Sequence, residues 1–251
     1  MKRVLTALLL LPVAIYSALF APWPVFAAVV AAVALISFYE YASITGAPRL
    51  PGYIAGLIIL FIPSAKLFTV LIVVTLLAMC LPLFSNTLER AFVRTTALLL
   101  GLAYIFGAWR TGIMLREIGR HWLMFALMVN WIGDTGAYYI GKNFGRHKLM
   151  PSVSPGKSWE GAAASAATAV IFGAIYLPLA IRGTSWWMAG LLALATNVAG
   201  QIGDLAESAI KRGAGVKDSG TLLPGHGGLL DRLDSTMFAL PVLYGLLTLG
   251  A

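Results

Sequence analysis

Long apolar runs recur along the whole chain, and they constrain its fold more than any other feature. A helix that spans a bilayer uses roughly 20 apolar residues. Runs of about that length predict spans near 4–21, 25–45, 52–65, 67–84, 95–115, 122–141, 160–181, 185–205 and 235–250. Only 11% of the 251 residues are charged, less than half the fraction in an average soluble domain. The sequence therefore predicts an all-α, polytopic transmembrane helical bundle of about eight or nine spans, and excludes a soluble enzyme and a disordered chain.

The distribution of lysine and arginine predicts how these spans are oriented. With Lys2 and Arg3 on the cytoplasmic side, 13 of the 18 basic residues fall on that side and four fall outside, as the positive-inside rule requires. Only Arg116 and Arg120 look misplaced. We therefore expect a multi-pass protein of the cell (inner) membrane. The net charge of +8 is ascribed to membrane lipids and a phosphorylated substrate, with no nucleic acid as partner.

Acidic residues gather in the second half of the chain, since only three of the ten precede residue 130. We expect residues 1–120 to form an N-terminal scaffold of transmembrane helices. Residues 121–251 are expected to form the catalytic region, with cytosolic loops at 141–158 and 206–234. Glu40 and Arg110 lie within spans, where a charge is costly, and the sequence does not identify their partners.

The densest group of polar residues runs from 203 to 234. Its first part places four side chains on one helix face, because they follow the spacing i, i+3, i+4, i+7: Asp204, Glu207, Ser208 and Lys211. Asp231 and Asp234 form a second acidic pair. Carboxylate pairs joined by a basic, glycine-rich loop can hold a divalent cation against phosphates. The candidate phosphate contacts are Lys211, Arg212, Lys217 and Arg232, with close backbone approach at Gly227 and Gly228. A merely polar juxtamembrane loop would not explain four acids near membrane depth.

A second polar segment covers residues 134–161. Asp134 lies inside an apolar helix and is a candidate functional residue; the alternative is an ion pair or hydrogen bond to a neighbouring helix. Gly156-Lys157-Ser158 resembles the end of a P-loop, but the first glycine of that motif would fall on Pro151, so a Walker A site is excluded. His226 is expected to bond a phosphate or order its loop, because a phosphate nucleophile is already largely ionised at pH 7.

These residues resemble the signature of phosphatidate cytidylyltransferases, the CDP-diacylglycerol synthases. The pattern matches without departure over 27 positions: Ser208-x-Ile210-Lys211-Arg212-x4-Lys217-Asp218-x-Gly220-x2-Leu223-Pro224-x-His226-Gly227-Gly228-Leu229-x-Asp231-Arg232-Leu233-Asp234. Segments 134–139 and 154–161 resemble other stretches typical of the family. The resemblance covers about the C-terminal half of the chain, whereas the N-terminal half is similar only in its hydrophobic character.

The resemblance implies that phosphatidate and CTP give CDP-diacylglycerol and pyrophosphate, with Mg²⁺ as cofactor and room for a second cation. It implies Asp204, Asp231 and Asp234 as metal-binding acids. The catalytic set it implies is completed by Lys211, Arg212, Lys217, Asp218, His226 and Arg232. We expect the substrate-binding residues to be Asp134, Lys157, Ser208, Gly227 and Gly228. Dimers are known in the family, so a homodimer is a further expectation.

Three alternative functions stay open at this point. A transporter of a lipid or anion would carry charges in broken helices near the midplane, whereas the acids here lie at the interface. A CDP-alcohol phosphotransferase would need a different acidic motif, because Asp231-Arg-Leu-Asp234 is followed by Ser-Thr. A CTP transferase that acts on an isoprenoid lipid phosphate would differ only in its lipid-facing surfaces.

Overall fold

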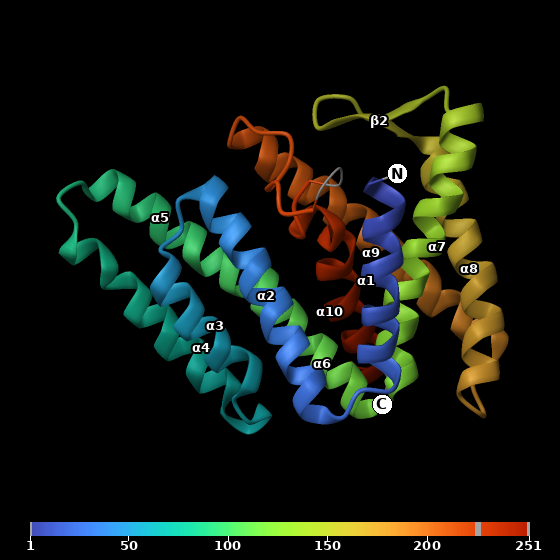
Figure 1. Cartoon of the computed structure of the whole chain (residues 1–251), viewed down its shortest axis with the longest axis horizontal. Helices are drawn as coiled ribbons and strands as arrows, with labels where there is room; N and C mark the ends of the chain where they lie inside the picture. The colour runs from blue at the N-terminus through green and yellow to red at the C-terminus, as the bar shows by residue number, and fades with distance from the viewer. Residues whose placement is uncertain (1, 224–226, 250–251) are drawn as a thin grey trace. The chain divides into compact units, whose positions relative to one another are not determined.

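The computed structural model describes residues 2–223 and 227–249, with side chains from residue 10 onward. The described chain is mainly helical (Figure 1). Its α-helices are α1 (Lys2–Leu19), α2 (Trp23–Thr45), α3 (Arg49–Phe61), α4 (Ser64–Met79), α5 (Leu88–Gly101), α6 (Ala108–Ile118), α7 (Arg120–Phe144), α8 (Trp159–Ala180), α9 (Trp186–Gly213) and α10 (Asp234–Leu249). The remaining elements are the 3₁₀ turns η1 (Leu81–Phe84) and η3 (Leu230–Arg232), the π-helical turn η2 (Leu102–Gly107), and strands β1 (Lys148–Met150) and β2 (Ser154–Ser158).

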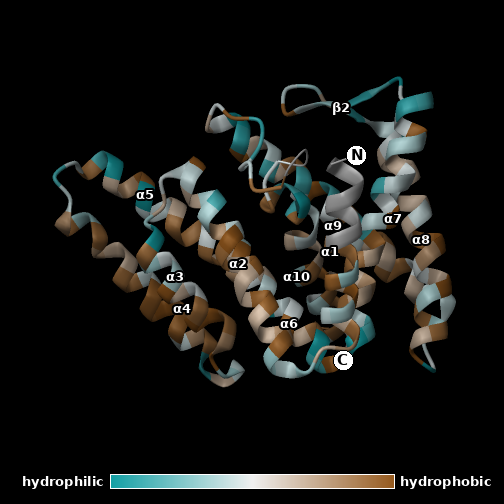
Figure 2. Cartoon of the chain, viewed as in Figure 1, coloured by the Kyte–Doolittle hydropathy of each residue, from teal (hydrophilic) through white to brown (hydrophobic). Residues whose placement is uncertain are grey.

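Four helical segments in the described residues are long and apolar enough to cross a membrane: Trp23–Thr45, Ser64–Phe84, Leu88–Ile118 and Trp159–Ala180. Figure 2 shows hydrophobic colouring along α3 and α4. Only 6% of the apolar window in Ser64–Phe84 is buried, as lipid contact requires. The prediction of an all-α membrane protein is confirmed. A helix lies at each predicted span, and the number of crossings stays a prediction.

Two helical segments extend well beyond the spans that the sequence predicts. The helix expected at 95–115 begins at Leu88, and the turn η2 carries it through to Ile118. The helix expected at 185–205 continues to Gly213, so the beginning of the predicted loop 206–234 is helical. This extension puts the acidic and basic residues from Asp204 to Lys211 on a regular helix, as their spacing predicts.

The chain divides into two compact units, and each is described by itself. Unit 1 comprises Met1–Leu10, Pro22–Arg110 and Asp218–Arg232. In its core, the rings of Phe38 and Phe106 lie 5.4 Å apart. A Cβ at Gly56 would overlap Phe106, so the absence of a side chain there lets α3 approach closely.

Arg110 has its partners within unit 1. Its guanidinium donates to the carbonyl of Leu60 at 2.7 Å and to Ser64 Oγ at 2.9 Å. Leu60 lies in the last turn of α3, where carbonyl groups lack partners within the helix, and Ser64 begins α4. Arg110 therefore holds together the two short helices that the sequence predicts as spans 52–65 and 67–84.

Unit 2 comprises Leu11–Ala21, Thr111–Lys217 and Leu233–Ala251. Its helices α7, α8, α9 and α10 pack against one another through small residues. A Cβ at Gly173 of α8 would overlap the side chain of Ala193 in α9, and Phe125 of α7 stacks on Tyr176 of α8. Close backbone approach of this kind is the usual basis of helix packing in membranes.

Arg116 and Arg120, which the charge distribution leaves on the wrong side, have structural roles in unit 2. Arg116 donates to the carbonyl groups of Ala18, at 3.0 Å, and of Ala21. Arg120 donates to the carbonyl of Leu19 at 3.0 Å. Both arginines therefore satisfy the carbonyl groups at the end of α1. Their positions follow from helix capping rather than from membrane orientation.

A short antiparallel hairpin of β1 and β2 interrupts the helices, which the all-α prediction did not include. Lys148 pairs with Ser158, and Met150 with Ser154. Pro155 and Gly156 within β2 disfavour a helix. The hairpin connects α7 to α8 and brings Lys157 to the polar end of unit 2.

Candidate active site

A pocket of about 410 Å³ lies among the helices of unit 2. α7 contributes Asp134 to its lining, β2 contributes Lys157, and α9 contributes Asp204. Small residues, among them Gly141 and Gly161, line much of the rest. Three residues predicted as site residues from separate segments of the sequence thus share one pocket.

Asp204 and Lys157 form an ion pair in this pocket. Lys157 Nζ lies 2.6 Å from Asp204 Oδ2, and the two side chains are 28% and 31% exposed. Ser208 lies one helical turn along α9 and donates to Asp204 Oδ1 at 3.4 Å. The pair is partly accessible, so either charged group can take a new partner without unfolding a backbone segment.

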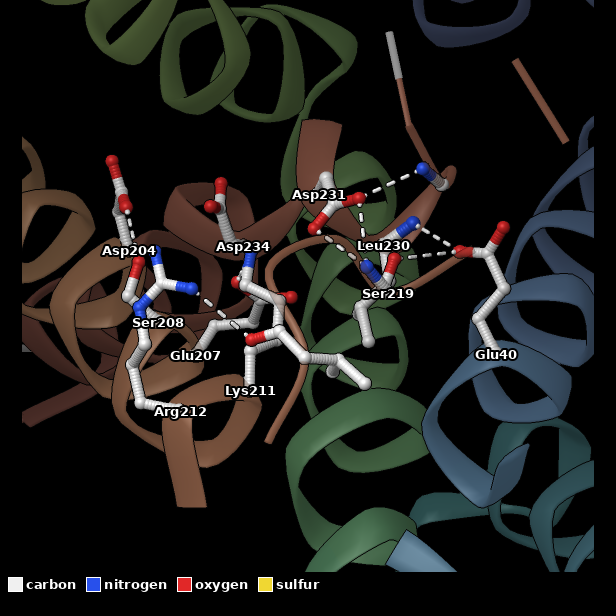
Figure 3. A network of polar contacts seen from close by, with 12 residues as sticks. Glu40, Asp204, Glu207, Ser208, Lys211, Arg212, Ser219, Leu230, Asp231 and Asp234 are labelled. Carbon is white, nitrogen blue, oxygen red and sulfur yellow. Dashed lines mark hydrogen bonds and ion pairs between the residues drawn. The ribbon is translucent and has the colours of Figure 1, made fainter. Parts of the chain in front are cut away.

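The inner face of α9 carries a second ion pair, between Glu207 and Lys211. Both residues are buried, with 1% and 8% of their surface exposed, and Figure 3 shows them one turn apart on the helix. A charge buried this deeply needs a paired partner. The predicted helix face is therefore confirmed in geometry, with Lys211 held by a carboxylate.

Asp234, at the polar start of α10, is also buried. Its Oδ1 accepts the N–H of Ser235 at 2.7 Å. Burial and the negative charges of Asp204 and Glu207 raise the pKa of Asp234 well above its usual range, while the Ser235 N–H and Lys211 act in the opposite direction. Three carboxylates are thus close enough to interact, and a bound cation would relieve their repulsion.

A buried amide network supports the pocket and has no counterpart in the sequence prediction. Asn197 Nδ2 donates to Ser165 Oγ at 3.1 Å, and Gln201 Nε2 donates to Asn197 Oδ1 at 2.8 Å. A Cβ at Gly133 would overlap the side chains of Asn197 and Ser165. The network fixes α7, α8 and α9 at the depth of the pocket. Amides in apolar helices are a sequence signal that could have identified it.

The hairpin that carries Lys157 is anchored by Glu160 in the first turn of α8. Its carboxylate accepts the N–H groups of Arg146 and His147 at 3.1 and 3.2 Å, and its Oε1 lies 2.6 Å from His147 Nδ1. Ser158 Oγ accepts the N–H of Gly161 and caps the helix. These contacts hold both ends of the segment that presents Lys157.

The signature loop, residues 218–232, belongs to unit 1. Asp231 Oδ2 accepts the N–H of Ser219 at 3.0 Å and that of Gly228 at 2.7 Å. Gly227 has a left-handed backbone with φ of 81°, which favours glycine. Asp231 therefore closes the loop on itself, and the glycines predicted to approach phosphates leave room for this closure.

A second carboxylate holds the same loop, and it comes from α2. Glu40 accepts hydrogen bonds from Ser219 Oγ and from the backbone N–H groups of Leu229 and Leu230. Figure 3 shows Ser219 and Leu230 beside the Glu40 side chain. The sequence places Glu40 in a span but does not identify its partners, because nothing in its local pattern indicates a contact with residues far along the chain.

Comparisons with known proteins bear on what this site does. The model of the cytidylyltransferase family matches residues 1–249. The chain belongs to the cytidylyltransferase family.

Three similar relatives are named phosphatidate cytidylyltransferase. That of Staphylococcus saprophyticus is 36% identical over 202 residues, 77% of this chain and 78% of that protein. That of Staphylococcus aureus is 37% identical, over 77% of each chain. That of Bacillus subtilis is 38% identical, over 73% of this chain and 67% of that protein. The resemblance in the sequence is confirmed.

In this member of the family, the unit 2 acids fit Mg²⁺ by the chemistry of their donors. Asp204 and Asp234 offer carboxylate oxygens, which Mg²⁺ prefers. Among the described residues, no three His, Cys, Asp or Glu side chains form a ready-made metal cage. Mg²⁺ usually binds one or two carboxylates and completes its shell with water and substrate phosphates. A two-carboxylate site is therefore chemically adequate.

The remaining predicted site residues are distributed over both units. Arg212 is bonded to the carbonyl groups of Val153, in the hairpin, and Val216, and Lys217 follows in the same unit. Asp218 and Arg232 lie at the two ends of the signature loop. His226 lies outside the described residues. The roles of all these residues stay predictions.

Proposed function

We propose that this chain transfers the cytidylyl group of CTP to phosphatidate, giving CDP-diacylglycerol and pyrophosphate for phospholipid synthesis. The observation that carries the proposal is the unit 2 pocket, where Lys157 and Asp204 meet beside Asp134. Such a site matches two phosphorylated reactants and a cation. The family and the names of the relatives support the same reaction.

The reaction needs positioning and charge screening more than acid–base chemistry. A phosphate oxygen of the lipid attacks the α-phosphorus of CTP, and the bond from that phosphorus to the bridging oxygen breaks as pyrophosphate leaves. Both reactants are anions and repel each other. Fixed cationic groups that face the phosphates lower this barrier, and alignment of the reactants lowers it further. No covalent enzyme intermediate is required.

The residues of unit 2 are suited to these tasks. Lys157 can move its ammonium group from Asp204 to a phosphate, because both side chains are partly exposed. Arg212 is exposed and donates to the backbone carbonyl groups of Val153 and Val216, so it too can bind phosphate. The buried pair of Glu207 and Lys211 sets the local charge on α9. Ser208 orients Asp204.

Asp204 and Asp234 would hold Mg²⁺, and the ion would screen the phosphate charge when bound. The resemblance adds Asp231 as a metal-binding residue, although its oxygens serve the signature loop in this structure. Lys217, His226, Arg232, Gly227 and Gly228 complete the proposed phosphate contacts, and Asp218 completes the proposed catalytic set. A second cation is proposed on the resemblance alone.

The membrane arrangement belongs to the same proposal. We infer eight or nine spans in the cell membrane, with residues 1–120 as scaffold, residues 121–251 as the catalytic region, and the active site on the cytoplasmic side. CTP is dissolved in the cytosol and the lipid phosphate lies at head-group level, so the site has to lie where they meet. The basic loops support this orientation. A homodimer is part of the proposal too.

The test uses purified protein in detergent micelles with α-³²P-labelled CTP, Mg²⁺ and either phosphatidate or an isoprenoid phosphate. We expect label in the organic phase with phosphatidate and its loss with EDTA. Label transferred only to the isoprenoid phosphate would change the acceptor and keep the chemistry. If folded protein labels neither lipid, the transferase proposal is wrong and the transporter becomes the better hypothesis.

A further inference from the structure

Glu40 is a carboxylate buried inside a helix that is apolar enough to span the membrane. It is 3% exposed and lies in α2, one of the four candidate spans. An unpaired charge in such surroundings is strongly unfavourable. An acid that persists there needs specific partners, and charged residues within spans commonly have a functional role.

Among the described residues, the hydrogen-bond partners of Glu40 come from the signature loop. Oε2 accepts the Ser219 hydroxyl at 3.1 Å and the N–H of Leu230 at 2.8 Å, while Oε1 accepts the N–H of Leu229 at 3.0 Å. Charge-assisted bonds of this kind are the stronger class of hydrogen bond. One carboxylate from α2 thus joins the beginning of the loop to its end.

Two glycines of the signature are explained by the same contact. A Cβ at Gly220 would lie 2.8 Å from Glu40 Oε1, and one at Gly228 would overlap both Ser219 and Glu40. Real Cβ atoms do not approach oxygen so closely, so any larger residue would displace the carboxylate. The glycine pattern of the loop is therefore shaped to receive Glu40.

The segments that Glu40 fixes flank residues with proposed catalytic roles. Asp218 precedes Ser219, and Asp231 follows Leu230. Asp231 in turn accepts the N–H groups of Ser219 and Gly228. A displacement of about 1 Å in a catalytic group can cost two orders of magnitude in rate. Loss of the Glu40 contacts would move these groups together.

We propose that Glu40 is a positioning residue for the transferase reaction, which holds the signature loop in its active conformation through its carboxylate. The proposal rests on the proposed function for its effect on turnover. Its structural part, the fixing of the loop, stands on the contacts alone.

The experiment compares wild type with Glu40→Gln, Glu40→Asp and a control, Glu89→Gln. Gln keeps the size of the side chain but replaces one acceptor oxygen with an NH₂ donor. Asp keeps both acceptors on a shorter chain. Glu89 is an exposed glutamate in the first turn of α5. Its substitution by Gln removes one negative charge, as Glu40→Gln does, but at a site away from the signature loop. Two quantities are measured for each protein. The first is the incorporation of CTP label into lipid, and the second is the amide hydrogen exchange of peptides that cover residues 218–232.

We expect Glu40→Gln to lower turnover about 30-fold to 100-fold and to speed exchange in the loop about tenfold, with α7 and α8 unchanged. Glu40→Asp should recover part of both, and Glu89→Gln should match wild type. The proposal is overturned if Glu40→Gln keeps wild-type turnover, or if its turnover falls while loop exchange does not change. It is also overturned if Glu40→Gln is more active than Glu40→Asp.

Two further comparisons keep the test decisive. If Glu40→Gln does not accumulate as folded protein, Ser219→Ala removes one donor and keeps both backbone bonds. It should then lower turnover about threefold and speed loop exchange, and wild-type behaviour in both would overturn the proposal. If wild type itself labels no lipid, the proposed function fails, and loop exchange alone decides whether Glu40 holds the loop.

Discussion

The two carboxylates that hold the signature loop of unit 1 are bonded differently from the two ion-paired carboxylates on helix α9 of unit 2. In unit 1, Glu40 and Asp231 accept mainly backbone N–H groups. In unit 2, Asp204 and Glu207 pair with the side chains of lysines. A backbone donor cannot leave without refolding its loop, whereas a flexible lysine can turn to a phosphate. The comparison indicates that Glu40 and Asp231 hold the shape of the loop, and we propose that Asp204 exchanges partners during the reaction.

The largest effect is expected from Asp204→Asn. The variant keeps the shape of the side chain and loses the charge that would face a cation, so turnover should fall at least about 100-fold. The midpoint of thermal unfolding should move little, because a partly exposed pair contributes about 0–1 kcal/mol. Glu117→Gln, an exposed glutamate of the same unit, is the matched control. Wild-type turnover in Asp204→Asn would remove this residue from the reaction.

Asp231→Asn tests a carboxylate that is bonded to backbone N–H groups rather than to a lysine. Asn has one acceptor oxygen where Asp has two, so the N–H groups of Ser219 and Gly228 lose part of their bonding. We expect turnover to fall about 30-fold or more with faster amide exchange in residues 218–232. A loss of turnover with unchanged loop exchange would show that Asp231 acts directly on metal or substrate.

Lys211→Ala should show that Lys211, unlike Lys157, stays with its carboxylate partner and stabilises the fold. From sequence alone Lys211 is expected to contact phosphates, so its loss would lower activity and leave the fold intact. The structure buries it against Glu207, and removal of one partner of a buried pair costs about 3–5 kcal/mol. We therefore expect less detergent-stable protein, measured by size-exclusion recovery after heating. Glu207→Gln with Lys211→Met should restore part of it. Full stability of Lys211→Ala would contradict the buried-pair assignment.

The smallest effect is expected from Lys157→Met. The methionine fills similar space but lacks the charge, so affinity for CTP should fall about tenfold through loss of one charge-assisted contact. Stability should be nearly unchanged, since the pair with Asp204 is partly exposed. Steady-state KM for CTP is the measurement, with Lys142→Met on the pocket wall as comparison. An unchanged KM would make Lys157 only a partner of Asp204.

Local patterns in the sequence predict much of this structure. Apolar runs indicate each helix, and the i, i+3, i+4, i+7 spacing places Asp204, Ser208 and Lys211 on one face of α9, because both signals depend on neighbours within a few turns. The signature also indicates the family before any contact is known.

Contacts between distant segments could not be predicted in this way. Glu40 meets Leu230 across 190 residues, and Arg116 reaches carbonyl groups of α1 across more than 90. Positive-inside counting treats an arginine as a charge, so it cannot recognise one that caps a helix. The pairing of Lys157 with Asp204 depends on the hairpin, whose anchor Glu160 gives no local signal beyond its place in a first helical turn.

The central claim is that the unit 2 pocket performs a Mg²⁺-dependent cytidylyl transfer in which Asp204 changes partners. The most direct test is a Mg²⁺ titration of CTP label transfer to phosphatidate, with wild type and Asp204→Asn side by side. We predict Mg²⁺-dependent labelled lipid from wild type, and from the variant a residual rate that needs much more Mg²⁺. Equal rates at every Mg²⁺ concentration would contradict the account.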